Sequence, residues 1–262
     1  DWYRNRWVRS ESVIEAHNEP VDGRDLGFGP NTNVIGHGGR TWAIVESGSR
    51  PIELSYTLDT IGQNPGWGGY TAHPKIDPDT GDLHAISYDW ANYRDHVKYT
   101  VMDADANLAK VVDIPLPNMS MLHDMSLTKN YIVIFDLPVT VSFIALGTGS
   151  SFPFRWNNDH EARVGVMPRN GTGKDMVWSS ISQNYAYHPM NAYEDDNGQI
   201  VVDICRYEKM FAADTNGPFG DSLPRLDRWT INPKGGKVSE QIIDERAQEC
   251  PRCHPDLNSK PY

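Results

Sequence analysis

The chain has 262 residues, which is long enough to form one large core. Its formal net charge at neutral pH is −11. Nucleic-acid binding needs clustered Lys or Arg. The pI is near 5.2 and the sequence shows no such cluster, which argues against nucleic acid as a partner. No run approaches the roughly 18 apolar residues of a membrane span. The composition permits an enzyme and leaves only a peripheral membrane contact open.

The cysteine content indicates a reducing compartment. The chain has three cysteines, Cys205, Cys250 and Cys253, and an odd count this small does not make a disulfide framework. We therefore expect a cytoplasmic location. Cys250 and Cys253 form a CxxC motif, but the chain has no second cysteine pair to complete a zinc site, and we assign the motif no role. Because the chain starts at Asp1 without an initiator Met, we expect an internal fragment of a longer protein.

Short runs rich in β-branched and aromatic residues recur along the chain, whereas helical periodicity is almost absent. We expect strands at Trp42–Val45, Val97–Met102, Tyr131–Phe135, Ile200–Ile204 and Arg228–Ile231. Turn signals suited to hairpins lie between such runs, at Asp77–Gly81, Asp103–Asn107, Asp195–Gly198 and Pro233–Gly236. These patterns predict an all-β chain of successive antiparallel hairpins.

Residues 81–114 show how the hairpins combine. Runs at Gly81–Tyr88, Val97–Met102 and Leu108–Ile114 follow one another as strands of one four-stranded blade. Blades stacked radially form a β-propeller, although a β-sandwich has a similar pattern. We predict one propeller domain over residues 1–262, incomplete at both ends. The irregular segment Leu146–Arg163 is predicted to be an excursion over one face rather than a strand, either a roof of the active site or an ordinary loop.

Three of the nine histidines lie beside strand-like runs in a context of low charge: His73, His123 and His188. They are separated by 50 and 65 residues, too far apart for a zinc finger or a helix face. A shared metal must then be bound where separate strands converge, which indicates a propeller axis. Solvent exposure or a local hydrogen bond accounts for the other six, which are His17, His37, His84, His96, His160 and His254.

Imidazole binds iron, zinc, copper and nickel, so histidine ligands alone do not identify the metal. A metal-bound histidine usually donates its other ring N–H to a carboxylate or a carbonyl, so acidic partners are expected. Glu46 follows the apolar run Trp42–Val45, and Glu249 precedes Cys250. Each of the two glutamates is a candidate partner, with an ordinary surface acid as the alternative.

At these residues the chain resembles the carotenoid cleavage oxygenases, the family that includes apocarotenoid oxygenases, lignostilbene-cleaving oxygenases and the retinal pigment epithelium isomerase. The resemblance covers nearly the whole chain. The motifs that carry it are Trp2–Arg9, Asn31–Val34, Ala43–Glu46, Thr71–Lys75, Leu122–Met125, Phe135–Pro138, Phe154–Trp156, Arg163–Pro168 and His188–Tyr193.

The resemblance implies a seven-bladed propeller with Fe(II) on its axis, held by four histidines. Three of the four match His73, His123 and His188, and the fourth lies beyond this chain; His254 is not a substitute. The resemblance further pairs Glu46 with His123 and Glu249 with His188, and a third orienting glutamate is absent. An open and weak metal site is therefore expected for the chain as given.

The implied activity is that of a non-haem Fe(II) dioxygenase, which inserts O2 across a conjugated C=C bond and releases two carbonyl products. The substrate is expected to be an apolar polyene or a stilbene-like alkene in a tunnel. Stilbene-cleaving relatives are expected to carry a lysine where this chain has Val45, which favours a carotenoid or apocarotenoid. Lining candidates, with core packing as the alternative for each, are Phe135, Phe154, Trp156 and Tyr187.

Three other interpretations remain open at this stage. A family member that cleaves a stilbene or another phenylpropanoid would keep the iron residues and change only the tunnel. A metal-free propeller would act as a binding module. A zinc hydrolase would need a general base near the metal, for which Glu46 or Asp124 is a candidate.

Overall fold

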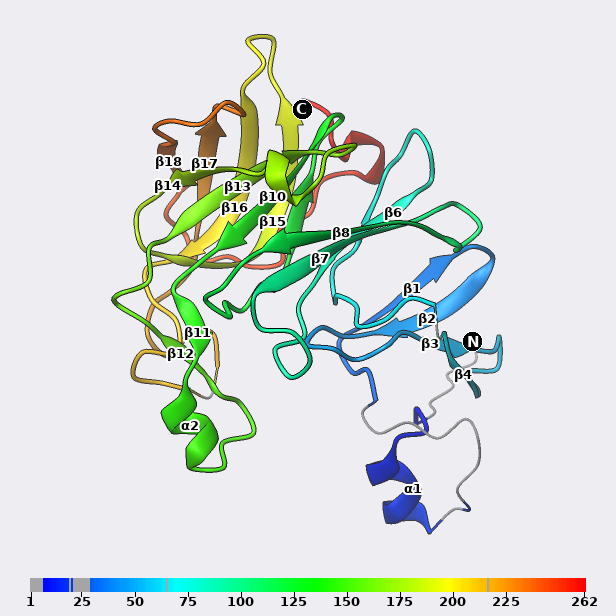
Figure 1. Cartoon of the computed structure of the whole chain (residues 1–262). Coiled ribbons are helices and arrows are strands. Elements are labelled where there is room, and N and C mark those ends of the chain that lie inside the picture. Colours follow the sequence, from blue (N-terminus) through cyan, green and yellow to red (C-terminus); the bar gives the residue numbers. More distant parts are fainter. Residues whose placement is uncertain (1–6, 19, 21–28, 65, 216) are drawn as a thin grey trace.

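The computed structural model describes residues 7–18, 20, 29–64, 66–215 and 217–262 (Figure 1). Most of the first motif, residues 2–6, lies outside them. The described part is nearly all β and contains four four-stranded antiparallel sheets. The first sheet comprises β1 (Asn33–His37), β2 (Arg40–Ile44), β3 (Ile52–Leu54) and β4 (Thr60–Gln63). The second comprises β5 (Lys75–Ile76), β6 (Leu83–Ser87), β7 (His96–Met102) and β8 (Leu108–Pro115).

The third sheet carries an insertion. Its strands are β9 (Met125–Leu127), β10 (Tyr131–Asp136), β13 (Arg163–Pro168) and β14 (Val177–Ser180). Between β10 and β13 the chain forms a separate ribbon of β11 (Val139–Val141) and β12 (Phe154–Trp156), with helix α2 (Phe143–Gly147) between them. The fourth sheet comprises β15 (Tyr185–Glu194), β16 (Ile200–Tyr207), β17 (Arg225–Ile231) and β18 (Ser239–Asp244).

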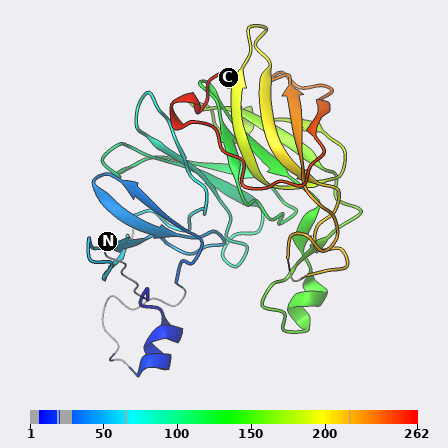
Figure 2. The same cartoon turned by 180° about the vertical axis from the view of Figure 1, so that it is seen from behind.

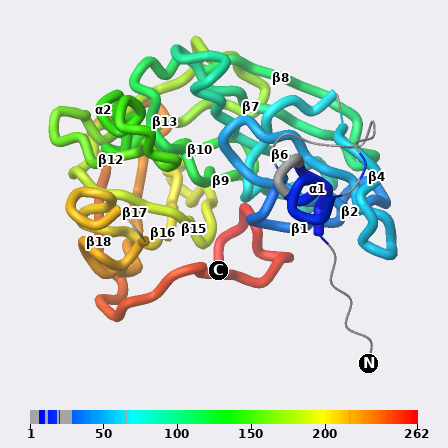
Figure 3. Tube along the Cα trace, turned by 90° about the horizontal axis from the view of Figure 1, so that it is seen from below, coloured from blue at the N-terminus to red at the C-terminus, as the bar shows by residue number. Residues whose placement is uncertain are grey.

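The four sheets follow one another around a common centre in chain order, as propeller blades do (Figure 3). The first strands of the second, third and fourth sheets are neighbours, since β9 contacts both β5 and β15. The all-β prediction is confirmed. Four of the five predicted strands lie wholly within a strand of the structure, and the fifth, Trp42–Val45, extends one residue past β2, which ends at Ile44. The number of seven blades stays a prediction.

Leu146–Arg163 was predicted to be an irregular excursion without a strand. This is wrong for Phe154–Trp156, which forms β12 and pairs with Val139–Val141. The flanking Gly and Pro residues obscured a strand of only three residues. The predicted turns do connect strands. At the tip of the β5–β6 hairpin, Gly81 adopts φ +77°, a left-handed conformation that glycine allows without strain, and its N–H donates to the Asp77 carbonyl at 2.9 Å.

The main core lies between the second, third and fourth sheets. Strand β16 is buried along its whole length, and its side chains are apolar or aromatic except for the charged residues Asp203 and Arg206. Tyr99, Tyr185 and Trp229 are fully buried in this core. Short helices lie outside the sheets: α1 (Glu11–His17), η1 (Gly173–Asp175) and η2 (Pro255–Leu257). No helix within the described ranges is long and apolar enough to cross a membrane.

After β18, the chain returns to the first strands of the sheets (red in Figure 2). Ser259 Oγ donates to the Leu127 carbonyl of β9 at 2.8 Å, and the Asn191 side-chain amide of β15 donates to the Leu257 carbonyl at 2.9 Å. These bonds fix the C-terminal segment against β9 and β15. The segment that contains Glu249 is thereby held between the fourth sheet and the centre.

Three histidines without an assigned chemical role, His37, His84 and His160, are buried and have partners distant in sequence, whereas solvent exposure or a local hydrogen bond was expected of them. His37 Nε2 lies 2.7 Å from the Asp103 carbonyl, and His160 Nε2 lies 2.9 Å from Asp136 Oδ1. His84 is buried, with Nδ1 2.7 Å from the Tyr99 hydroxyl and Nε2 2.9 Å from an Arg169 nitrogen.

His84 generates a prediction about acid stability. Burial, followed by the Arg169 guanidinium, lowers the pKa of His84 from 6.5 to about 4. The unfolded chain therefore takes up this proton at a higher pH than the folded chain does. The free energy of unfolding is therefore unaffected by this group above pH 6.5 and decreases as the pH falls toward 4, by at most about 3 kcal/mol.

Urea unfolding of His84→Gln should show a shallower loss of stability between pH 6.5 and 4 than the wild type, because the variant lacks this proton uptake. His254→Gln, at an exposed histidine, is the control, and equal slopes for His84→Gln and wild type would contradict the assignment.

Candidate metal centre

The three predicted histidines lie at the inner ends of three consecutive sheets. His73 precedes β5 by two residues, His123 precedes β9 by two residues, and His188 lies within β15. These are the first strands of the second, third and fourth sheets, and first strands lie nearest the centre of a propeller. The sheets therefore bring together side chains that are far apart in sequence.

The imidazole rings face one another through their Nε2 atoms. His123 Nε2 lies 2.9 Å from His73 Nε2 and 3.2 Å from His188 Nε2. All three ligand nitrogens lie within 4.8 Å of one another, and the three rings are partly buried. Two nitrogens that bind one ion at about 2.1 Å, roughly at right angles, are about 3 Å apart. The observed separations fit ligands of a shared ion.

A β-bulge directs His188 to this point. The pairing of β15 with β16 shifts register between Ala186 and Pro189, so Tyr187 and His188 lie outside the regular ladder. A bulge adds a residue on one strand and re-aims its side chain. Tyr187 then packs edge-on against His123, with ring centroids 4.9 Å apart.

Two carboxylates contact the opposite nitrogens of the rings. Glu46, just after β2, places Oε2 2.8 Å from His123 Nδ1. Glu249, after β18, places Oε2 2.7 Å from His188 Nδ1. Each carboxylate is mostly buried, with 14% of its side chain exposed. This arrangement favours the tautomer with the proton on Nδ1 and directs the Nε2 lone pairs toward one another.

Where two Nε2 lone pairs face each other they repel, and either a shared proton or a cation between the rings relieves this repulsion. Burial, then the neighbouring His123 and His188, lowers the pKa of His73 to about 2, so this ring is neutral. Burial also acts to lower the pKa of His123, but the carboxylates of Glu46, Asp124 and Glu249 together outweigh burial and the net shift is upward. The facing Nε2 atoms and the carboxylates behind two of the rings make the cluster a candidate cation site. The sequence pattern indicated these five residues, while their roles as ligands and orienting groups stay predictions.

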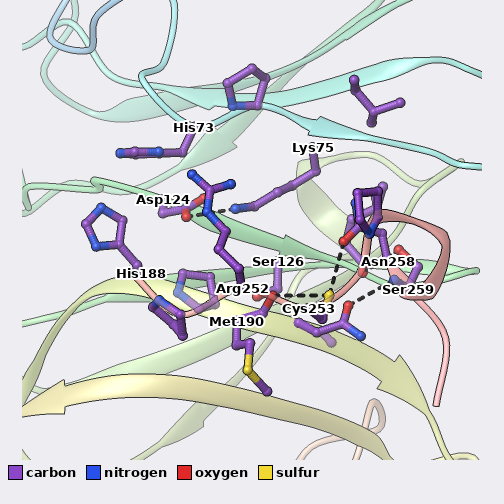
Figure 4. Close-up of a pocket in the computed structure, with 18 of the residues that line it drawn as sticks. His73, Lys75, Asp124, Ser126, His188, Met190, Arg252, Cys253, Asn258 and Ser259 are labelled. Atoms are coloured by element: carbon purple, nitrogen blue, oxygen red, sulfur yellow. Dashed lines mark hydrogen bonds and ion pairs between the residues drawn. The ribbon is translucent and has the colours of Figure 1, made fainter. Parts of the chain in front are cut away.

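A cavity of about 500 Å³ borders two of the histidines, His73 and His188 (Figure 4). Lys75 and Arg252 extend into the same space. Lys75 Nζ contacts Asp124 Oδ2 at 2.7 Å, and Asp124 Oδ1 accepts from the Met125 N–H at 2.6 Å. The sequence analysis did not assign Lys75 or Arg252. Lys75 lies two residues after His73, and Arg252 lies three residues after Glu249. This proximity in sequence to predicted site residues was the signal that could have indicated both.

The four predicted lining residues and Val45, the fifth residue predicted to contact substrate, lie elsewhere, since the described lining of this cavity includes none of them. Phe135 packs against Trp229, with centroids 5.9 Å apart, and Phe154 lies 6.0 Å from Tyr88 in the same way. Both phenylalanines are buried core residues, which is the alternative that the sequence left open. Val45 is buried beside Glu46, and Trp156 and Tyr187 are half-buried. Roles of these residues in substrate binding stay predictions.

Comparison with known proteins gives a consistent assignment. The family model of the retinal pigment epithelial membrane protein matches residues 2–262. The carotenoid cleavage oxygenase of Mycobacterium tuberculosis (strain H37Rv) is 42% identical over the whole chain. The crystal structure of Pseudomonas brassicacearum lignostilbene dioxygenase aligns with 88% of the chain at 30% identity and a TM-score of 0.78. That of cobalt-substituted Synechocystis apocarotenoid oxygenase aligns with 98% at 23% identity and a TM-score of 0.82, a likeness of fold alone.

The chain belongs to the retinal pigment epithelial membrane protein family, which includes the carotenoid cleavage oxygenases. It spans 62% of the length of the mycobacterial relative, 51% of the lignostilbene dioxygenase chain and 61% of the apocarotenoid oxygenase chain.

Proposed function

We propose that the protein is a non-haem Fe(II) oxygenase that uses O2 to cleave a conjugated C=C bond into two carbonyl products. One observation carries the proposal: three imidazole nitrogens face a single point, and carboxylates contact the far side of two of the rings. Nitrogen ligands without thiolate are compatible with iron. When bound, Fe(II) would supply the redox chemistry that activates O2 toward an electron-rich alkene.

The residues around the histidines argue against the hydrolase alternative. A zinc hydrolase needs a carboxylate free to accept a proton from water. Glu46 already contacts His123 Nδ1, and Asp124 is occupied by Lys75 and by the Met125 N–H. Both acids are therefore better placed to orient other groups than to act as a general base.

The protein's own groups would set the geometry of the centre. His73, His123 and His188 would hold the iron, with Glu46 and Glu249 keeping the proton of two rings on Nδ1. The edge of Tyr187 against His123 restricts rotation of that ring. Such positioning matters because small displacements of reacting groups lower rates strongly.

We propose a carotenoid or apocarotenoid as the substrate class. The name of the mycobacterial relative supports this class, and so does Val45 in place of the lysine expected of stilbene-cleaving relatives. The lignostilbene dioxygenase, at 30% identity, supports a stilbene or phenylpropanoid as the second candidate. Product analysis with both substrate classes distinguishes them.

We further propose a cytoplasmic protein that contacts membranes peripherally through α2. All three cysteines are free, in keeping with a reducing compartment. The ribbon that carries α2 projects from the sheets (Figure 1), and Phe143, Ile144 and Leu146 are 62%, 82% and 46% exposed. Such clustered apolar side chains fit the interface of a lipid bilayer, where an apolar polyene would dissolve.

Iron content and O2-dependent cleavage of an apocarotenal test the proposed activity. The intact protein should contain bound iron and form two carbonyl products, each carrying one labelled atom from 18O2 when the products are trapped by reduction. His123→Ala should lose both iron and cleavage because it removes the central nitrogen of the cluster. His254→Ala, at a histidine with 69% of its side chain exposed, should retain both.

A folded wild-type protein that binds no iron and cleaves neither substrate class would contradict this function and favour the binding-module alternative. Label in only one product would indicate a monooxygenase instead.

Vesicle binding tests the membrane contact. Ile144→Asp should weaken partitioning onto phosphatidylcholine vesicles by roughly tenfold, since it removes an apolar side chain worth about 1.5–3 kcal/mol when buried. Ile242→Asp on β18, at a residue 49% exposed, is the matched control and should bind as the wild type does. Equal partitioning of both variants would contradict a contact through α2.

A further inference from the structure

An ion pair joins the segments that carry two of the candidate metal ligands. Lys75, at the start of β5, lies two residues after His73, and Asp124 directly follows His123. Lys75 Nζ lies 2.7 Å from Asp124 Oδ2 (Figure 4). The pair crosses from the second sheet to the third, and these two sheets share no strand pairing among the described residues.

Asp124 is held through both of its carboxylate oxygens. Oδ2 contacts Lys75, and Oδ1 accepts from the N–H of Met125 at 2.6 Å, where β9 begins. Asp124 is 4% exposed, and 28% of the Lys75 side chain is exposed. The pair therefore ties the residue that follows His123 to the start of β5.

The segment around His73 is anchored on both sides. Before it, the side-chain amide of Asn33 on β1 donates to the Ala72 carbonyl at 3.1 Å, which ties this residue to the first sheet. After it, Lys75 reaches the third sheet through Asp124. The backbone on either side of His73 is thus bound to a different neighbouring sheet.

His73 depends on these anchors more than the other two histidines do. Carboxylate oxygens lie 2.8 Å from Nδ1 of His123 and 2.7 Å from Nδ1 of His188. No carboxylate contacts the His73 ring within the part of the chain that the structure describes. Without an orienting acid, the position of this ring follows from the backbone that carries it.

We propose that Lys75 and Asp124 are positioning residues for the metal centre, and that their ion pair sets the separation between the Nε2 atoms of His73 and His123. These two nitrogens lie 2.9 Å apart, a separation that one metal ion can bridge. Neither residue is a ligand, since each acts through the histidine that precedes it in sequence. This role rests on the proposed function, because it concerns the same metal ion.

A second buried ion pair provides a matched control. Arg228 Nε and Nη2 lie 2.7 and 2.8 Å from the two carboxylate oxygens of Asp203, which is 2% exposed. This pair joins β16 to β17, which already pair along their length, so it adds no connection between sheets. Removing one partner of a buried ion pair is destabilising wherever the pair lies. Loss of the Arg228 guanidinium should therefore lower stability without moving the histidines.

Cobalt titration of the iron-free, intact protein tests this role, because Co²⁺ binds imidazole and its visible absorption reports the ligand geometry. Lys75→Met should weaken Co²⁺ binding by about tenfold or more, the usual effect of losing a group that orients metal ligands. Lys75→Arg keeps the charge and the reach of the side chain, so it should retain most of the affinity. Arg228→Met should bind Co²⁺ as the wild type does, while urea unfolding of the metal-free protein should show that it is destabilised.

A double variant separates positioning from the cost of an unpaired charge. Lys75→Met leaves the Asp124 carboxylate buried without its cation, whereas Lys75→Met/Asp124→Asn removes both charges and keeps an oxygen for the Met125 N–H. The double variant should weaken Co²⁺ binding as much as Lys75→Met does alone, since both remove the same ion pair.

Wild-type Co²⁺ affinity in the double variant or in Lys75→Met would overturn the proposal. An equal loss of affinity in Arg228→Met would overturn it as well, because it would indicate a general effect of lower stability. The titration does not depend on cleavage. The expected pattern of Co²⁺ binding in a protein that cleaves no alkene would support this role and contradict the oxygenase, whereas a wild type that binds no Co²⁺ would contradict both.

Discussion

Three imidazole nitrogens face one another at the inner ends of three sheets, and the neighbouring strands and carboxylates hold them in this arrangement. His123 Nε2 lies 2.9 and 3.2 Å from the corresponding atoms of His73 and His188. His73 and His123 lie two residues before β5 and β9, and His188 lies within β15, so the backbone fixes each ring at the first strand of a different sheet. The contacts between β9 and its neighbours β5 and β15 hold these strands together, so the fold supplies the free energy that keeps the nitrogens close.

The carboxylates explain why the proposed occupant of the cluster is a cation. Glu46 and Glu249 approach the Nδ1 side of two rings from the connection after β2 and from the C-terminal segment after β18. They place negative charge behind neutral ligands, and a metal at the centre would complete the charge balance.

Much of the fold and of the candidate centre could be predicted from the sequence. β-rich runs and turn residues are local signals, and they located strands such as β7 and β16. The family motifs indicated the three histidines and two glutamates. The β12 strand was missed because three residues among Gly and Pro give little pattern. The bulge at His188 depends on register with β16, and the contacts of Lys75 with Asp124 and of Cys250 with His188 join residues 49 and 62 positions apart. No local pattern encodes such distances.

X-ray absorption spectroscopy of the iron-loaded intact protein tests the central claim most directly, because it reports which atoms surround the iron. We expect a shell of nitrogen or oxygen scatterers near 2.1 Å, with the outer-shell pattern of several imidazole rings and no sulfur. In His123→Ala the imidazole pattern should weaken or the iron should be lost. A sulfur shell would instead place the iron beside Cys250, and a spectrum without imidazole would contradict a shared ion between the three histidines.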